Sequence, residues 1–128
     1  MLEEAVKILV VDDETSVLES FQMILKIRDY DVTTAQNVDE AISRANQGSY
    51  DVAFVDLRLN GHEEGLDILK LLKSKKPSPE VVIVTAYASE RTQANAIELG
   101  AMEYISKPFL MEEIYDLVNR AIRKKRSR

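Results

Sequence analysis

The chain has 128 residues, of which 45% are hydrophobic and 30% charged, and its formal net charge is −5. This composition predicts one folded, soluble domain and argues against a body that binds nucleic acid directly. The absence of cysteine excludes disulfides and thiolate metal sites, and a single histidine excludes most zinc sites. No apolar run approaches the ~20 residues of a membrane helix, and the acidic N-terminus lacks the basic region of a secretory signal, so we expect a cytoplasmic protein with no membrane partner.

Short apolar runs that are rich in β-branched residues predict three strands, at 8–11, 52–55 and 81–84. Continuous runs of this kind are typical of central strands in a parallel sheet that helices cover on both faces. The more polar segment 31–35 predicts an edge strand, and the segment 102–105 predicts a weaker fifth strand.

Helical periodicity fills the intervals between these strands. Apolar residues recur at helical spacing in the segments 17–25, 38–45, 66–72, 94–97 and 114–122. Asn37 and Glu40 form a predicted capping box before the second helix, and Gly100 follows the weak fourth helix as a C-terminal cap. Strands that alternate with helices predict a parallel α/β fold, and we expect a flavodoxin-like (βα)5 three-layer sandwich with sheet order 2-1-3-4-5.

Polar residues follow four of the five predicted strands. They are Asp12, Asp13 and Glu14 after the first strand, Asp56 at the end of the third, Thr85 at the end of the fourth (with Ala86 directly after it), and Lys107 after the fifth. An aspartate after an apolar run is commonly a turn former. The carboxyl ends of parallel strands meet at one edge of the sheet, however, so we expect these groups to form a shared site.

The chemistry of this set favours a metal ion and a phosphoryl group. Carboxylates that lie close together raise one another's pKa unless a cation neutralises them, and Mg²⁺ is a hard cation that prefers oxygen ligands. A lysine and a hydroxyl are suitable partners for phosphoryl oxygens. An aspartate is itself a nucleophile toward phosphorus, and phosphoryl transfer depends mainly on positioning and charge stabilisation.

Four motifs resemble, in order and in separation, the receiver domain of bacterial two-component response regulators. They are ILVVDDE at 8–14, DVAFVDL at 51–57, VVIVTAY at 81–87 and GAMEYISKPF at 100–109. Each motif alone is weak, but together they are specific and cover about the whole chain. The finer resemblance is to receivers of the NtrC type, which commonly precede an ATPase module that activates sigma-54 promoters. We expect a receiver domain at 1–124, and at 125–128 a basic tail or the start of a linker to an output domain absent from this chain.

The resemblance implies the chemical roles of the residues at the strand ends. Asp56 would accept a phosphoryl group from a sensor histidine kinase. Mg²⁺ (or Mn²⁺) would be held by Asp13 directly, by Asp12 mostly through water, by Asp56 and by the backbone carbonyl of Arg58. The Thr85 hydroxyl, the Ala86 amide and Lys107 would hold phosphoryl oxygens, and the bond from Lys107 to Pro108 is expected to be cis.

The resemblance also implies how the domain signals. Tyr104 would be an aromatic switch that swings inward as Thr85 moves toward the phosphoryl group, which biases a two-state equilibrium and controls an output, transcription being the expected one. The fourth helix, fifth strand and fifth helix would form the readout surface and a homodimer contact. We do not expect an enzyme, beyond a domain that assists its own phosphorylation and dephosphorylation.

One loop departs from the usual receiver pattern, and two residues occupy positions that affect the lifetime of the phosphoryl group. Asn60 stands where receivers usually carry a proline, and Gly65 lies nine residues after Asp56 where a glycine is usual eight residues after, so the intervening loop is one residue longer. Arg58 and Tyr87 occupy the two positions that tune phosphoryl lifetime in the family, and their bulk predicts a long-lived phosphoryl state.

Two other functions compete with this interpretation. A magnesium-dependent phosphohydrolase of the haloacid-dehalogenase type would carry a second aspartate two residues after Asp56, where this chain has Arg58. A receiver-like adaptor would act by protein contacts alone, without phosphorylation. The retained acids, threonine and lysine argue against the adaptor, and the altered loop, in which we expect an exposed His62, is the feature in its favour.

Overall fold

Five parallel strands form the central sheet of the computed structural model, which describes residues 5–127. The strands are β1 (Lys7–Val11), β2 (Asp31–Ala35), β3 (Val52–Asp56), β4 (Glu80–Thr85) and β5 (Glu103–Ser106). Their order in the sheet is β2-β1-β3-β4-β5, which confirms the predicted topology. The fifth strand begins and ends one residue later than the predicted segment 102–105, because pairing with β4 runs from Glu103 to Ser106.

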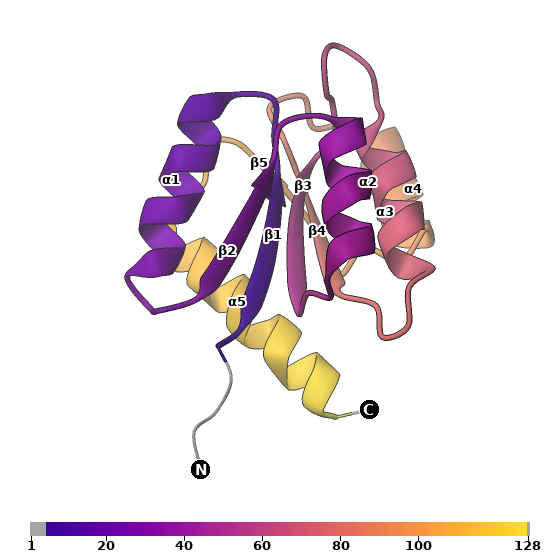
Figure 1. Cartoon of the computed structure of the whole chain (residues 1–128). Helices are drawn as coiled ribbons and strands as arrows, with labels where there is room; N and C mark the ends of the chain where they lie inside the picture. Colours follow the sequence, from indigo (N-terminus) through magenta and orange to yellow (C-terminus); the bar gives the residue numbers. More distant parts are fainter. Residues whose placement is uncertain (1–4, 128) are drawn as a thin grey trace.

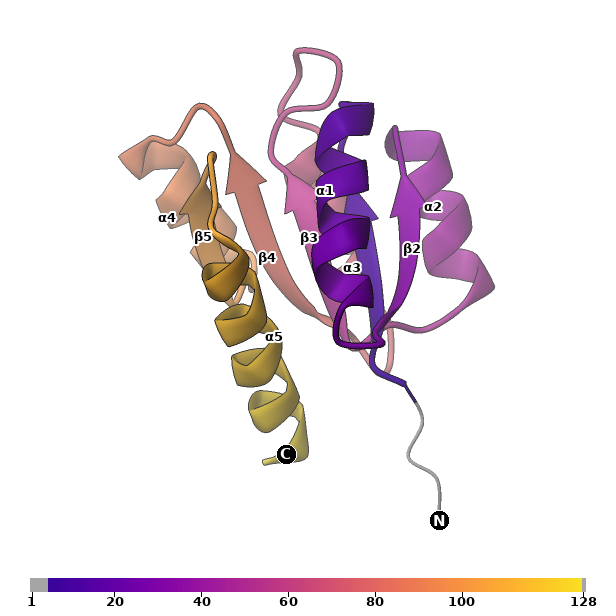
Figure 2. The same ribbon diagram turned by 90° about the vertical axis from the view of Figure 1, so that its left-hand side faces the viewer.

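Helices cover both faces of this sheet. They are α1 (Thr15–Lys26), α2 (Val38–Gln47), α3 (Gly65–Lys73), α4 (Glu90–Glu98) and α5 (Met111–Arg126). Helices α1 and α5 lie on one face, and α2, α3 and α4 lie on the other (Figure 1). The view turned by 90° shows α1 and α5 in front of the sheet (Figure 2). The predicted flavodoxin-like three-layer sandwich is therefore confirmed.

The core is divided by the sheet into two apolar layers. Consecutive residues of a strand point to opposite faces, so Ile8 and Val10 pack in the layer of α1 and α5, whereas Leu9 and Val11 pack in the other layer. The burial of both faces explains why β1 is a continuous apolar run. Phe21 of α1 packs on Phe54 of β3, with ring centroids 5.1 Å apart.

Two predicted helix caps are present, one of them in modified form. The Asn37 side chain accepts a hydrogen bond from the Glu40 N–H at 2.8 Å. The Glu40 carboxylate accepts from the N–H of Gln36 at 2.8 Å, one residue earlier than a standard capping box requires. Gly100 follows α4 with a φ of 106°, which is the left-handed conformation of a C-terminal glycine cap.

The segment between β3 and α3 projects beyond the carboxyl edge of the sheet (Figure 1). It returns to the sheet at Gly65, where an added Cβ would lie 2.1 Å from the Asp56 carbonyl oxygen. Only glycine allows this close approach of α3 to the end of β3. The loop that the sequence predicts to be one residue longer than usual therefore ends at Gly65.

Helix α5 continues through the boundary expected between residues 124 and 125 and ends at Arg126. The first four residues of the predicted domain and Arg128 of the predicted tail lie outside the described residues. Within the described part of the chain, no helix has the length and apolarity needed to cross a membrane.

Candidate functional site

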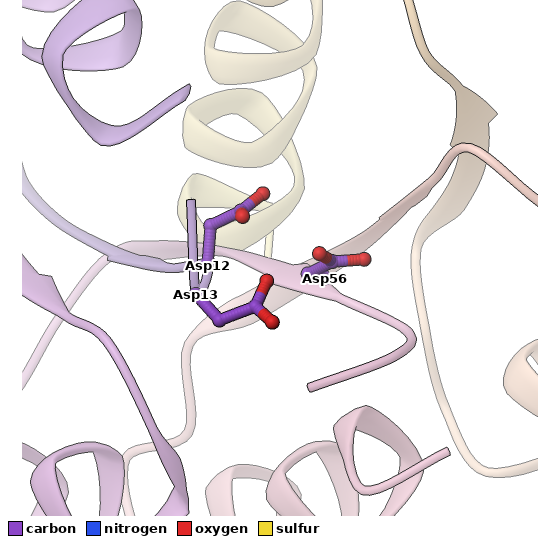
Figure 3. A group of neighbouring side chains, drawn as sticks. All are labelled: Asp12, Asp13 and Asp56. Atoms are coloured by element: carbon purple, nitrogen blue, oxygen red, sulfur yellow. The ribbon is translucent and has the colours of Figure 1, made fainter. Parts of the chain in front are cut away.

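Three carboxylates converge at the carboxyl edge of the sheet, as the sequence predicts. Asp12 and Asp13 follow β1, and Asp56 ends the neighbouring strand β3 (Figure 3). One oxygen from each of the three lies within 4.8 Å of the others. Asp12 and Asp56 are buried and Asp13 is exposed, so the group opens to solvent on the Asp13 side.

Lys107 is shared between the two buried carboxylates. Its Nζ lies 2.8 Å from Asp12 Oδ2 and 3.2 Å from Asp56 Oδ2. The backbone N–H of Lys107 donates to the Thr85 carbonyl at 2.8 Å, and the following bond to Pro108 is cis, the isomer that the resemblance implied. The strand pairing and the turn after it therefore fix the lysine over the acids.

The burial of Asp56 beside other charged groups changes its pKa. Burial, reinforced by the nearby negative charge of Asp12, raises the pKa of Asp56 from 3.8 to about 6, although Lys107 and the N–H of Arg58 act in the opposite direction. Burial alone would lower the pKa of Lys107, but its hydrogen bonds and ion pairs with Asp12 and Asp56 raise that pKa overall. The carboxylates of the site therefore carry more negative charge than Lys107 neutralises.

The site has the composition and space that a hard divalent cation requires. Three carboxylates and one ammonium give a formal charge of −3 + 1 = −2 when all are ionised. A hollow of about 250 Å³ lies beside them, lined in part by Asp13, Asp56 and Lys107. Oxygen donors, excess negative charge and room for bound water suit Mg²⁺ or a similar ion.

The other residues predicted for the site are only partly gathered there. Ala86 and Arg58 line the same hollow. The Arg58 N–H donates to Asp56 Oδ1 at 3.3 Å, so the backbone of Arg58 passes beside that carboxylate. The Thr85 side chain is buried, and its Oγ1 accepts from the Tyr87 N–H at 2.9 Å.

Tyr104 lies away from the acids, on the α4 side of the sheet. Its ring is buried, and its hydroxyl shares a hydrogen bond of 2.6 Å with the Thr92 hydroxyl. The hydroxyl also accepts from the Ser89 N–H at 3.2 Å. The structure therefore holds Tyr104 in an inward position, against the start of α4.

The sequence reasoning missed two sets of contacts around the site. It did not connect Tyr104 to Ser89 and Thr92, although a serine before a helical segment is a recognisable N-cap and Ser89 accepts from the Thr92 N–H at 3.2 Å. It also missed the contact of the Asn60 N–H with Asp13 Oδ2 at 3.1 Å. The dipeptide Asn60–Gly61 is a tight-turn signal that could have indicated a defined loop.

Comparison with known proteins identifies the family. The model of the response regulator receiver domain matches residues 8–119. The alginate biosynthesis transcriptional regulatory protein AlgB of Pseudomonas syringae pv. tomato is 39% identical over 102 residues, which are 80% of this chain and 22% of that protein. The chain spans 22–55% of the length of curated relatives of this kind.

Solved structures agree with this assignment. NtrX from Brucella abortus superposes with a TM-score of 0.86 at 30% identity, covering 96% of this chain and 28% of that one. A response regulator from Burkholderia pseudomallei, solved with a phosphorylated aspartic acid, a calcium ion and citrate, has a TM-score of 0.83 at 29% identity and covers 95% and 72%. The chain therefore belongs to the response regulator receiver domain family.

Proposed function

We propose that this domain accepts a phosphoryl group from a histidine kinase on Asp56, with Mg²⁺, and thereby controls an output. One observation carries the proposal: two buried carboxylates share a single lysine, and a third, exposed carboxylate lies close to them beside an open hollow. This arrangement destabilises the metal-free site and leaves an oxygen nucleophile accessible. The Burkholderia relative with its phosphorylated aspartic acid supports the same chemistry here.

In the proposed reaction, a carboxylate oxygen of Asp56 forms a bond to phosphorus while the phosphorus–nitrogen bond of the donor phosphohistidine breaks. The imidazole leaves with the electron pair and takes up a proton. Bound by Asp12, Asp13, Asp56 and the Arg58 carbonyl, Mg²⁺ would neutralise charge on the carboxylates and the phosphoryl oxygens. Asp56 must be ionised to attack, so its pKa of about 6 makes the metal-free nucleophile sensitive to mildly acidic pH.

Residues of the chain would stabilise the product. The Lys107 ammonium, 3.2 Å from Asp56 Oδ2, is placed to pair with a phosphoryl oxygen on that carboxylate. Ala86 lines the hollow, where its N–H is a suitable donor. The Thr85 hydroxyl accepts from Tyr87, and a hydroxyl that accepts one bond can donate its own proton to another acceptor.

The output would depend on the position of Thr85 and α4. Movement of the Thr85 hydroxyl toward a phosphoryl oxygen breaks its bond with the Tyr87 N–H and changes the loop that leads to Ser89. Ser89 and Thr92 both contact the Tyr104 hydroxyl. We therefore propose that the inward Tyr104 belongs to the signalling arrangement, and that phosphorylation raises its population.

Intact mass after incubation with acetyl phosphate tests the proposal. We expect wild type to gain one phosphoryl group only when Mg²⁺ is present, and Asp56→Asn to gain none. Asp51→Asn, which removes an acid at the opposite edge of the sheet, is the matched control and should still be modified. Absence of any gain under conditions that modify a control receiver would contradict the proposal and favour the adaptor function.

The phosphoryl group on this domain is proposed to be long-lived. The Arg58 guanidinium lies over the Tyr87 ring, 5.1 Å from its centroid, and both residues line the hollow beside Asp56. Together the two side chains restrict the access of an attacking water molecule to a phosphoryl group on Asp56. Arg58→Ala with Tyr87→Ala should shorten the half-life measured by loss of the phosphorylated mass, and a half-life of seconds in wild type would refute the idea.

The output is proposed to be transcription, in a protein of the NtrC type. AlgB is named a transcriptional regulatory protein, and NtrX is among the similar structures. The surface of α4, β5 and α5, with Ile97 exposed and Arg120 paired to Glu103, is the proposed dimer contact. Sedimentation with and without acetyl phosphate tests this, and a monomer under both conditions at high concentration would contradict it.

A further inference from the structure

The longer loop after Asp56 contacts the acidic site through its backbone. The N–H of Asn60 donates to Asp13 Oδ2 at 3.1 Å, although the two residues are 47 positions apart in the chain. Asp13 is the exposed member of the three carboxylates. Repulsion by Asp12 and Asp56 would turn an unrestrained Asp13 side chain away from them, so a donor on the loop side opposes that rotation.

The backbone conformation of the loop directs this N–H toward Asp13. Leu59 and His62 form an isolated antiparallel bridge, with N–H to carbonyl distances of 2.8 and 3.1 Å. Between them, Asn60 and Gly61 have φ values of 54° and 82°. Two successive positive φ values are the pattern of a type I′ turn, for which Asn-Gly is the favoured sequence. The turn's own hydrogen bonds use the N–H groups of Leu59 and His62, and the N–H of Asn60 is directed to Asp13 instead.

Two further contacts hold the turn in place. The Leu59 side chain is fully buried, which anchors one end of the turn in the core. The Arg58 guanidinium donates to the Gly61 carbonyl at 2.9 Å, which ties the tip of the turn to the segment directly after Asp56. The position of the Asn60 N–H is therefore set by the fold and not by a freely moving loop.

We propose that the Asn60 backbone N–H is a positioning group that orients Asp13 for cation binding. This inference rests on the proposed function, because it assumes that the acidic group binds a divalent cation. A residue that orients a metal ligand commonly changes metal affinity by 10-fold or more when it is removed. A proline at this position has no N–H and cannot adopt a positive φ, so it could not serve in this way.

Two substitutions at one position separate the N–H from the side chain. Asn60→Pro removes the donor and forbids the observed φ, whereas Asn60→Gly keeps both. Binding of Mn²⁺ is measured by electron paramagnetic resonance of the free ion, with Mg²⁺ competition as a second reading. We expect Asn60→Pro to weaken binding about ten-fold and Asn60→Gly to bind as wild type does.

A double-mutant cycle shows whether the effect acts through Asp13. In an Asp13→Ala background, Asn60→Pro should cause no further loss of Mn²⁺ affinity, because the group it positions is absent. Equal losses in both backgrounds would overturn the proposal and indicate general damage to the loop. Gly61→Val is a milder second variant if Asn60→Pro does not fold, since a Cβ at Gly61 meets no atom within 4 Å but the φ of 82° strains it.

Hydrogen exchange gives a reading without metal. The Asn60 amide should exchange faster in Asp13→Ala than in wild type, while the His62 amide, bonded to Leu59 O, should not change. Unchanged exchange at Asn60 would overturn the inference. Failure of the proposed function looks different, because wild type itself would then bind neither Mn²⁺ nor Mg²⁺.

Discussion

Acids lie at both ends of the parallel strands: at the amino edge of the sheet, where the strands begin, and at the carboxyl edge, where they end. The two edges differ in how the charge of these acids is neutralised. At the amino edge, Asp51 accepts from the Lys7 N–H at 2.9 Å and lies 3.5 Å from Lys125 Nζ, and the buried Glu80 lies 3.7 Å from Lys124 Nζ. Each of these two acids thus has a lysine of its own from the last turns of α5.

At the carboxyl edge, Asp12 and Asp56 share Lys107, and Asp13 is oriented toward them. The chain supplies less positive charge there than the carboxylates require. This difference distinguishes acids that contribute to the stability of the fold from acids that serve the function of the domain. Acids that are paired within the chain connect α5 to the sheet, whereas acids that the chain leaves under-neutralised form the site that we propose for an external cation and a phosphoryl group.

Removal of Lys107 should have the largest effect on this balance. Without metal, Lys107→Ala leaves Asp12 and Asp56 buried without their shared cation, and breaking a buried ion pair in this way costs about 3 kcal/mol of unfolding free energy. Urea unfolding with a chelator present measures the loss. The cost should be smaller in an Asp56→Asn background, and an identical loss in both backgrounds would show that the acids do not act as a unit.

Removal of one acid should change the free energy of unfolding in opposite directions at the two edges. Asp56→Asn should stabilise the metal-free domain near neutral pH, because the rise in the pKa of Asp56 from 3.8 to about 6 sets an upper limit of about 3 kcal/mol on the gain. Asp51→Asn should destabilise it, because that carboxylate accepts from Lys7 and pairs with Lys125. Saturating Mg²⁺ should reverse the Asp56→Asn advantage and leave Asp51→Asn unaffected.

The pH dependence of stability should follow from the same carboxylate. Because the pKa of Asp56 is higher in the folded state, the folded protein binds more protons than the unfolded chain between about pH 4 and about pH 6. The stability that Asp56 contributes is therefore fully present below about pH 4 and is lost as the pH rises through about 6.

Unfolding free energies of wild type and Asp56→Asn across this range isolate that contribution, since the other acids are common to both proteins. The difference between the two should grow with pH and then level off above about pH 7. A difference that does not change with pH would show that Asp56 titrates normally in the metal-free protein.

Much of the carboxyl edge could be predicted from the sequence, because strand ends are fixed by periodicity and parallel strands bring their ends together. Asp12, Asp56 and Lys107 are placed by that rule alone. The amino edge could not be predicted in the same way. The pairing of Lys125 with Asp51 depends on the length and tilt of α5, and no local pattern in the chain records these.

Loop geometry was likewise beyond sequence reasoning. The extra residue after Asp56 was visible, but its contact with Asp13 depends on how the Asn60–Gly61 turn packs on its neighbours. The inward position of Tyr104 depends on the Ser89 N–H and the Thr92 hydroxyl, which come from another element of the chain. Such contacts are set by tertiary structure and leave only weak local signals.

The smallest effect is expected at the amino edge, from Lys125→Ala. Its Nζ is 3.5 Å from Asp51 Oδ1, and the Asp51 side chain is 41% exposed, so water and salt screen the pair. Pairs of this kind contribute about 0.5 kcal/mol or less, and Asp51 keeps its bond from the Lys7 N–H. Urea unfolding should show this small loss with and without Mg²⁺. A loss as large as that of Lys107→Ala would mean that the last turn of α5 depends on its charge as strongly as the carboxyl edge does, and the distinction between the two edges would fail.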